Sequence, residues 1–307
     1  SFKKKIIVPG DKSLSIRWVL FASLGEGTSR ARNLLMSEDV IAALNTIKKF
    51  GIKVKIKKND IKVYGKGFGG YKYSKRLVID AENSGTLGRL ILGILVDTPY
   101  PIKIIGDKSL SKRDFKRVTD PLAHLGAKFK LKNNKNLPLT IFGSKNLNPI
   151  KYNEVRGSAQ CKSSVIFGAM KANGTSIIKA KKSRNHTELL CKYLRLPIYV
   201  KTKKKYDEII VKKVNRIKPL NYNIPSDISS SAFFIVLTAL SENSKLTIKN
   251  VNINPSRTGI ITILKKMGVK IILKNKKIYK GEKKADIKVV SAKNIRAINC
   301  PPALNSG

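Results

Sequence analysis

The stretch DKSLSIRWVLFASLGEGTSRARN, residues 11–33, shows the plan on which the whole chain is built. It opens with a short polar cluster, continues as an apolar helix of about three or four turns, and leaves through a turn into a strand. Three later stretches follow the same plan, at residues 83–105, 158–180 and 227–250. Counted from Lys12, the starts are 71, 75 and 69 residues apart, so the chain repeats a unit of about 70 residues.

A second helix and two further strands complete each unit. The second helices begin within residues 37–56, 116–131, 183–200 and 256–272. Three of them end in GIKV, GAKF or GVKI. In each, the glycine can adopt the left-handed conformation at the helix end, and the residues after it are typical of a strand. The sequence therefore predicts an α/β fold of compact β-α-β-α-β-β units. A fifth polar cluster is expected near residue 300, so we expect the chain to be truncated as a unit begins.

The composition is that of a globular protein with an extreme charge. The 307 residues include 63 Lys and Arg but only 19 Asp and Glu, which gives a net charge of +44. Only 13 of the basic residues are Arg, and the Lys are spread along the chain without interleaved aromatic residues. We therefore favour a diffuse, solvated basic surface, while a nucleic-acid-binding or RNA-end-processing protein remains the alternative.

The sequence gives no indication of a membrane span, a signal segment or a metal site. No apolar run reaches the roughly 18 residues that a transmembrane helix needs. Cys161, Cys191 and Cys300 form no CxxC pair. Unpaired cysteines are typical of reduced thiols, so we expect a cytoplasmic protein without zinc.

The polar clusters stand where helices begin, and we call them the helix mouths: residues 11–13, 83–86 and 158–160, with residues 227–229 as the fourth. A helix start exposes N–H groups without partners and the positive end of the helix dipole, which together bind phosphate or carboxylate. In the first mouth Asp11 or Ser13 can cap the helix. Lys12 and Ser13 stand at its start, and Arg17 follows one turn later on the same face.

The other mouths and two loops supply similar groups. They are Asn83, Gly85 and Arg89 in the second unit, Ser158, Ala159 and Gln160 in the third, and Arg113, Ser183 and Arg184 in loops. A single mouth is more simply explained as a helix cap with surface cations. Three mouths in one repeat family, with Arg in the loops, indicate a phosphorylated small molecule carrying several negative charges. His124 is expected on a helix surface or as a satisfied core residue, His186 in support of a helix cap, and Phe233 and Phe234 in the core.

Eight motifs, taken in order, resemble those of the EPSP synthase family, the 3-phosphoshikimate 1-carboxyvinyltransferases. They are PGDKSLSIR, EGTSRARNLLMSEDV, NSGTLGRL, GDKSLSKRDFKRVTDPLAHLGA, SAQCKSSVIFGA, SRNHTE, SDISSSAFF and NPSRTG. The resemblance implies an enolpyruvyl-transferase-like fold of two domains with three units each and a cleft between them. Residues 14–222 would form one complete domain. Residues 1–13 and 223–307 would form part of the second, which is incomplete.

The resemblance also implies the reaction and the residues that serve it. The enolpyruvyl group of phosphoenolpyruvate is transferred to the 5-hydroxyl of shikimate 3-phosphate, with release of phosphate and without a metal or cofactor. Lys12 would contact both substrates and take part in proton transfer. Shikimate 3-phosphate would be bound by Lys12, Ser13, Arg17, Ser158, Ala159, Gln160, Ser183 and Arg184. Phosphoenolpyruvate would be bound by Lys12, Asn83, Gly85, Arg89, Arg113 and Gln160.

Some family features are absent from or altered in this chain. The family's acid/base Asp and its K-E-S-D-R motif would follow Gly307, so we expect weak binding of shikimate 3-phosphate and no measurable turnover from these residues alone. Ser226 stands where Gly is usual and Asn185 where Asp is common, and the role of Asp227 near the hinge is open. Gly85 implies sensitivity to glyphosate. We expect a monomer that binds neither nucleic acid nor membranes.

One rival shares the fold. The enolpyruvyl transferase that acts on a UDP-N-acetylglucosamine substrate carries a reactive Cys in the loop that corresponds to GDKSLSKRDF, residues 106–115. No Cys occurs in that stretch here.

Overall fold

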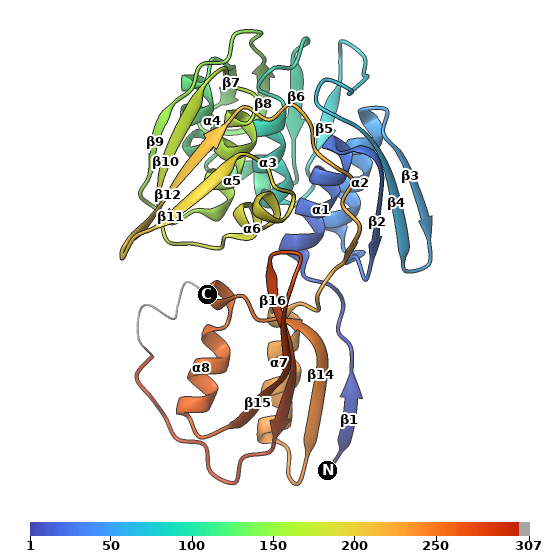
Figure 1. Cartoon of the computed structure of the whole chain (residues 1–307), viewed down its shortest axis with the longest axis vertical. Helices are drawn as coiled ribbons and strands as arrows, with labels where there is room; N and C mark the ends of the chain where they lie inside the picture. The colour runs from blue at the N-terminus through green and yellow to red at the C-terminus, as the bar shows by residue number, and fades with distance from the viewer. Residues whose placement is uncertain (301–307) are drawn as a thin grey trace.

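The computed structural model describes residues 1–300 and has two lobes joined by two chain crossings (Figure 1). The first three units form the large lobe and the fourth forms most of the small lobe. The described residues contain four four-stranded sheets and eight α-helices. The expected fifth cluster falls largely on residues 301–307, outside the described part of the chain.

The predicted β-α-β-α-β-β order is found within the second and third units, whereas the first and fourth units follow it from their first helix onwards. The first unit contains α1 (Lys12–Leu24), β2 (Glu26–Arg32), α2 (Glu38–Lys49), β3 (Lys53–Lys57) and β4 (Asp60–Lys66). The second contains β5 (Val78–Asp80), α3 (Gly85–Ile94), β6 (Ile102–Ile105), η1 (Leu110–Lys112), α4 (Lys116–His124), β7 (Lys128–Lys132) and β8 (Asn136–Phe142). The third contains β9 (Lys151–Glu154), α5 (Ala159–Ala169), β10 (Thr175–Lys181), α6 (His186–Tyr193), β11 (Ile198–Thr202) and β12 (Tyr206–Lys212). The fourth contains α7 (Ile228–Leu240), β14 (Lys245–Asn252), η2 (Pro255–Arg257), α8 (Gly259–Lys266), β15 (Lys270–Tyr279) and β16 (Glu282–Val290).

All four sheets share one strand order, but two of them borrow their first strand from a distant part of the chain. In each sheet the first strand runs parallel to the second, and the other pairs are antiparallel. The first unit takes β13 (Tyr222–Asn223), which pairs with β2. The fourth unit takes β1 (Lys3–Ile6), which pairs with β14 from Lys3 opposite Lys245. The lobes therefore exchange strands.

The second helix of each unit turns into its strand through a residue with positive φ. Gly51, Gly126 and Gly268 take this conformation, as predicted from GIKV, GAKF and GVKI. In the third unit Arg195 occupies the position with a φ of 55°. A glycine is thus the favoured residue at this turn but is not the only one that the chain uses.

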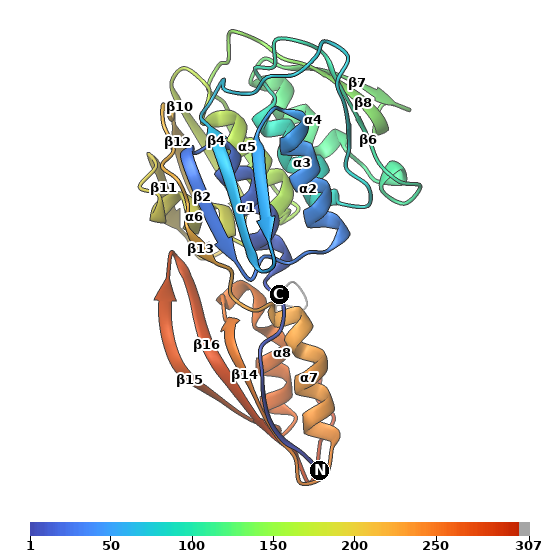
Figure 2. The same cartoon turned by 90° about the vertical axis from the view of Figure 1, so that its right-hand side faces the viewer.

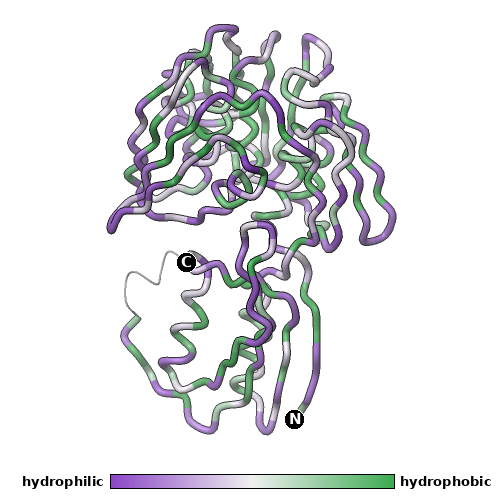
Figure 3. Tube along the Cα trace, in the orientation of Figure 1, coloured by the Kyte–Doolittle hydropathy of each residue, from purple (hydrophilic) through white to green (hydrophobic). Residues whose placement is uncertain are grey.

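The large lobe has its core around three inner helices, α1, α3 and α5. Leu14 to Leu24 of α1 are all buried, which explains why this helix shows no polar stripe. The sheets lie outside these helices (Figure 1), and hydrophobic residues run through the centre of the lobe in Figure 3. One continuous apolar cluster extends from Leu14 to Ile224.

The small lobe has a separate, thinner core. Its apolar cluster contains Val8 and then residues from Ile228 to Val289. Helices α7 and α8 cover one face of its sheet (Figure 2). The prediction that Phe233 and Phe234 are core residues is wrong, because their side chains are 77% and 41% exposed. Among the described residues, α7 lacks the two neighbouring inner helices that enclose α1.

Candidate active site

Four polar side chains cap the four inner helices, as the helix mouths predict. Asp11 Oδ1 accepts the N–H of Leu14, and Ser84 Oγ accepts that of Leu87. Ser158 and Asp227 cap α5 and α7 in the same way. Each cap satisfies one N–H of the first turn and fixes where the helix begins.

The two crossings, residues 7–11 and 224–227, bring the first and fourth mouths together between the lobes. The N–H of Asp11 donates to the carbonyl of Pro225 at 2.8 Å, and the N–H of Asp227 donates to that of Pro9 at 3.0 Å. The N–H of Lys12 also donates to Asp227 Oδ2, at 3.2 Å. Helices α1 and α7 therefore begin side by side.

The second mouth gathers two guanidinium groups and two amides. Arg113 Nη2 donates to Asn83 Oδ1 at 3.0 Å, and Arg89 Nη1 donates to Gln160 Oε1 at 2.7 Å. Gly85 lies between the two arginines, since a Cβ there would stand 2.7 Å from Arg89 Nη1 and 3.0 Å from Arg113 Nη1. The structure thus brings together Asn83, Gly85, Arg89, Arg113 and Gln160, which come from two units and a loop.

Arg89 is a buried cation in this cluster. Only 2% of it is exposed, and its guanidinium lies over the ring of Phe115. Burial, with a further contribution from nearby Arg117, lowers the pKa of Arg89 to about 10, so it keeps its charge at neutral pH. Within residues 1–300 neither Arg89 nor Arg113 forms an ion pair with a carboxylate. The arrangement therefore favours an anionic ligand here.

The first mouth presents Lys12 on the surface and keeps Arg17 inside. The Lys12 side chain is half-exposed, and its Nζ lies 3.4 Å from Asp39 Oδ2. Arg17 is 2% exposed; its Nε donates to Thr187 Oγ1, and its Nη1 donates to the carbonyl of Ser13. Burial lowers the pKa of Arg17 to about 10, which leaves it charged. Arg17 therefore supports Ser13 and α6 from behind the mouth.

The third mouth is joined by a loop before α6. Glu154 Oε2 accepts the N–H of Ser158 at 2.9 Å, which fixes the start of α5 beside Ala159 and Gln160. Ser183 Oγ is buried without a hydrogen-bond partner. Burial, with a further contribution from Arg257, lowers the pKa of Arg184.

A buried polar network, which no sequence motif indicated, crosses from one lobe to the other. His186 Nδ1 lies 2.6 Å from Glu282 Oε1, and neither side chain is exposed. His186 was expected only to support a cap, but it contacts a carboxylate at the start of β16. Asn252 and Asn254 donate to the other oxygen of Glu282. His124, in contrast, is exposed on α4, which is the first of the two positions expected for it.

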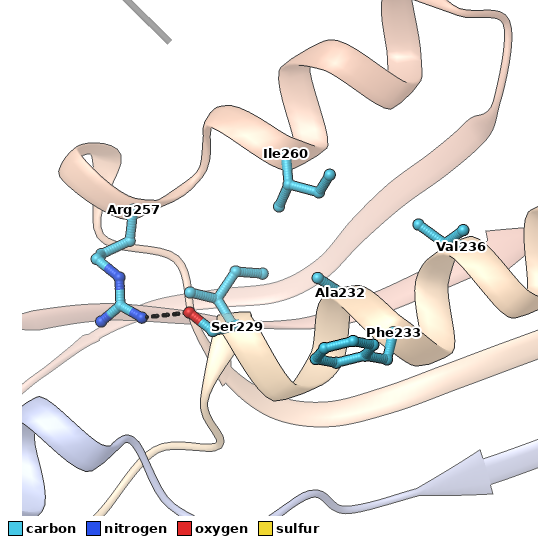
Figure 4. A pocket seen from close by; sticks show the side chains of 7 residues that line it. Ser229, Ala232, Phe233, Val236, Arg257 and Ile260 are labelled. Atoms are coloured by element: carbon cyan, nitrogen blue, oxygen red, sulfur yellow. Dashed lines mark hydrogen bonds between the residues drawn. The ribbon is translucent and has the colours of Figure 1, made fainter. Parts of the chain in front are cut away.

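Arg257 also belongs to the junction of the lobes, although it was not among the predicted site residues. It lies in NPSRTG, and the motif was the only signal that could have found it. Its guanidinium forms ion pairs with Asp11 at 2.9 Å and with Asp227 at 3.3 Å. It also stands at one end of a mainly apolar cavity of about 580 Å³ between α7 and α8 (Figure 4).

The described residues contain no group of three His, Cys, Asp or Glu side chains that could hold a metal ion. Within the same residues, no helix has the length and apolar character that crossing a bilayer requires.

A scaffold of repeated β-α-β-α-β-β units, with cationic inner-helix mouths beside a two-lobed junction, is that of the enolpyruvyl transferases. The comparisons with known proteins give the particular family. Residues 1–303 match the family described as EPSP synthase (3-phosphoshikimate 1-carboxyvinyltransferase), and the chain belongs to this family.

Relatives and solved structures agree with this assignment. The 3-phosphoshikimate 1-carboxyvinyltransferase of Caldicellulosiruptor saccharolyticus is 42% identical over 299 residues, which cover 96% of this chain and 68% of the relative. That of Streptococcus mutans is 40% identical over 271 residues, covering 88% and 62%. EPSP synthase from Acinetobacter baumannii superposes with a TM-score of 0.90 at 33% identity, covering 99% of this chain and 68% of that structure. The chain thus spans about two thirds of the length of these proteins.

Proposed function

We propose that the mouths of α1, α3 and α5 form the sites of this chain for phosphoenolpyruvate and shikimate 3-phosphate. The family's reaction transfers the enolpyruvyl group of the first to the 5-hydroxyl of the second. A C–O bond forms between that hydroxyl oxygen and C2 of phosphoenolpyruvate, and phosphate leaves with its bridging oxygen. The UDP-N-acetylglucosamine alternative is not favoured by the family match or by the relatives.

The observation that carries this proposal is the cluster at the second mouth. Arg89 and Arg113 point their guanidinium groups to the two sides of Gly85, without a carboxylate partner in the described chain. Phosphoenolpyruvate carries a phosphate and a carboxylate, and planar guanidinium groups can bind either of them through two hydrogen bonds. We assign this substrate to Asn83, Gly85, Arg89, Arg113 and Gln160, together with Lys12 of the first mouth.

We assign shikimate 3-phosphate to the first and third mouths and the loop before α6. The residues are Lys12, Ser13, Arg17, Ser158, Ala159, Gln160, Ser183 and Arg184. Gln160 stands between the two assigned sites, because it is the second residue of α5 and accepts from Arg89 of α3. Arg17 acts mainly by holding Ser13, through the hydrogen bond from its Nη1 to the Ser13 carbonyl.

Lys12 is the residue that we assign to proton transfer. It is the first residue of α1, and its half-exposed ammonium stands at that helix mouth. An ammonium is a suitable donor for the methylene carbon of phosphoenolpyruvate, which gains a proton when C2 is attacked and loses it again when phosphate leaves.

The assembly and location of the chain are also proposals. We propose a monomer in the cytoplasm that binds neither nucleic acid nor membranes, with a division into residues 14–222 and residues 1–13 with 223–307. The two apolar clusters support a division into two bodies, since one runs from Leu14 to Ile224 and the other contains Val8 and residues from Ile228 to Val289.

Calorimetric titration with shikimate 3-phosphate tests the main proposal without requiring turnover. We expect saturable binding that is weakened at least tenfold by Lys12→Ala and by Arg17→Ala, about 1.4 kcal/mol or more each. Arg216→Ala is the matched control, because Arg216 is exposed and its one ion pair within residues 1–300 is with Glu26 on the surface. Binding that is absent from the unaltered chain, or equal in all three variants, would contradict the assignment.

Gly85→Ala tests the second mouth. The new methyl group would displace Arg89 and Arg113, so we expect the affinity for phosphoenolpyruvate and for glyphosate to fall about tenfold, or about 1.4 kcal/mol. Affinity for shikimate 3-phosphate should change less than twofold. Titration of each ligand measures the effect, and an unchanged glyphosate affinity would show that Gly85 does not border the site.

A further inference from the structure

We propose that Arg257 is a positioning residue, which holds the mouth of α1 in place by joining the caps of α1 and α7 across the junction of the lobes. Arg257 is not among the residues assigned to phosphoenolpyruvate or shikimate 3-phosphate, and it acts through Asp11 and Asp227. The binding of substrate at the α1 mouth rests on the proposed function. The role of Arg257 in fixing this mouth rests only on the contacts that Arg257 makes.

The contact with Asp11 links Arg257 to the first turn of α1. Asp11 uses Oδ1 to accept the N–H of Leu14 and uses Oδ2 to accept Nη1 of Arg257 at 2.9 Å. The Asp11 side chain is completely buried, so its orientation is set by these two donors. Without the guanidinium, the carboxylate would keep the cap but lose the group that holds its second oxygen.

The contacts with the fourth mouth complete the link. Arg257 Nη2 donates to Ser229 Oγ at 2.7 Å, as Figure 4 shows, and to Asp227 Oδ1 at 3.3 Å. Asp227 Oδ2 accepts the N–H of Lys12. One guanidinium in the small lobe thus reaches the backbone of Lys12 through Asp227 and that of Leu14 through Asp11.

Charge and burial explain why an arginine stands at this place. Arg257 is 5% exposed, and two carboxylates lie against it. Burial alone would raise the pKa of Asp11, but His186 and Arg257 outweigh it, and the pKa stays below its ordinary value. A planar group with several donors can serve both carboxylates at once, which a single ammonium cannot do with the same geometry.

The link can be measured by hydrogen exchange of backbone amides in the full chain. We expect Arg257→Met to speed exchange of the Lys12 and Leu14 amides at least tenfold. The first turn of α5 is capped by Ser158 and, in the described chain, has no hydrogen bond or ion pair with Arg257, so its exchange should change less than twofold. Arg257→Lys should give an intermediate effect, and it remains informative if Arg257→Met does not fold. Arg216→Met is the control for loss of an arginine.

The outcomes separate this inference from the proposed function. Selective acceleration at α1 supports the inference whether or not shikimate 3-phosphate binds. Unchanged exchange at α1, or equal acceleration at α1 and α5, would overturn it, since the second result means a general loss of stability. Absence of ligand binding in the unaltered chain would instead count against the proposed function.

A double-mutant cycle then tests the effect on the ligand. If Arg257 acts through the α1 mouth, Arg257→Met should weaken shikimate 3-phosphate binding about tenfold in the unaltered chain and less than threefold in the Lys12→Ala background. Equal losses in the two backgrounds would mean that Arg257 acts independently of Lys12 and would contradict the inference. The cycle isolates their coupling because each single variant removes one member of the link.

Discussion

Glu188→Ala is expected to lower the free energy of unfolding by about 3–5 kcal/mol, because it leaves the Lys162 ammonium buried without a counter-charge. Lys162 is fully buried in α5, and its Nζ lies 2.7 Å from Glu188 Oε1 in α6. Urea unfolding followed by circular dichroism measures the change.

The double variant Lys162→Met, Glu188→Leu is the control for this experiment. It removes both charges at similar volume, so we expect it to recover most of the lost stability. A loss below about 1 kcal/mol in Glu188→Ala would show that water or another group compensates Lys162, contrary to the buried pair described here.

Gly93→Ala is expected to give the largest loss of stability and ligand binding among single methyl additions to α3. A Cβ at residue 93 would stand 1.9 Å from the carbonyl oxygen of Ser164, so α3 and α5 would have to move apart. Overpacking of this kind typically costs about 1–3 kcal/mol and occasionally more, and here the contact is with backbone that cannot rotate away. We therefore expect a loss at or above the upper end.

Gly93→Ala should also lower the affinity for both ligands, because α3 and α5 carry the second and third mouths. Gly88→Ala is the matched control on the same helix. Its Cβ would meet only side chains, at 3.3 Å from Phe115 and 3.4 Å from Ala81. Thermal unfolding with ligand titration compares the two variants. Equal behaviour of Gly93→Ala and Gly88→Ala would mean that the helix crossing is not as close as described.

The sequence predicted the repeating architecture and the helix starts because both depend on local signals. Capping residues, apolar periodicity and glycines at helix ends act within a few residues of each other, and Asp11, Ser84, Ser158 and Gly51 all behave as those signals indicate. The convergence of the second mouth with Gln160 could be expected only from the family resemblance, since it joins groups 71 residues apart.

The remaining features depend on contacts between distant residues, which a single sequence does not display. Arg17 looks like a cation open to a ligand, yet Ser163 and Thr187 enclose it. His186 meets Glu282 across 96 residues. Phe233 and Phe234 have the character of core residues, but the described chain places no further inner helix beside them. An apolar pattern indicates that a side chain favours burial, but whether it is buried depends on which elements the fold packs beside it.

The exchange of strands has a consequence for how the protein is made. Strand β1 leaves the ribosome before the large lobe, but its partner, residues 245–248, follows only after the entire large lobe has been synthesised. Contacts of such high sequence separation carry a large loop-closure cost and slow folding. The nascent chain therefore carries β1 unpaired until residues 245–248 have been made. Lys3, Lys4 and Lys5 of this strand repel one another and are well hydrated, which disfavours pairing with other strands before that point.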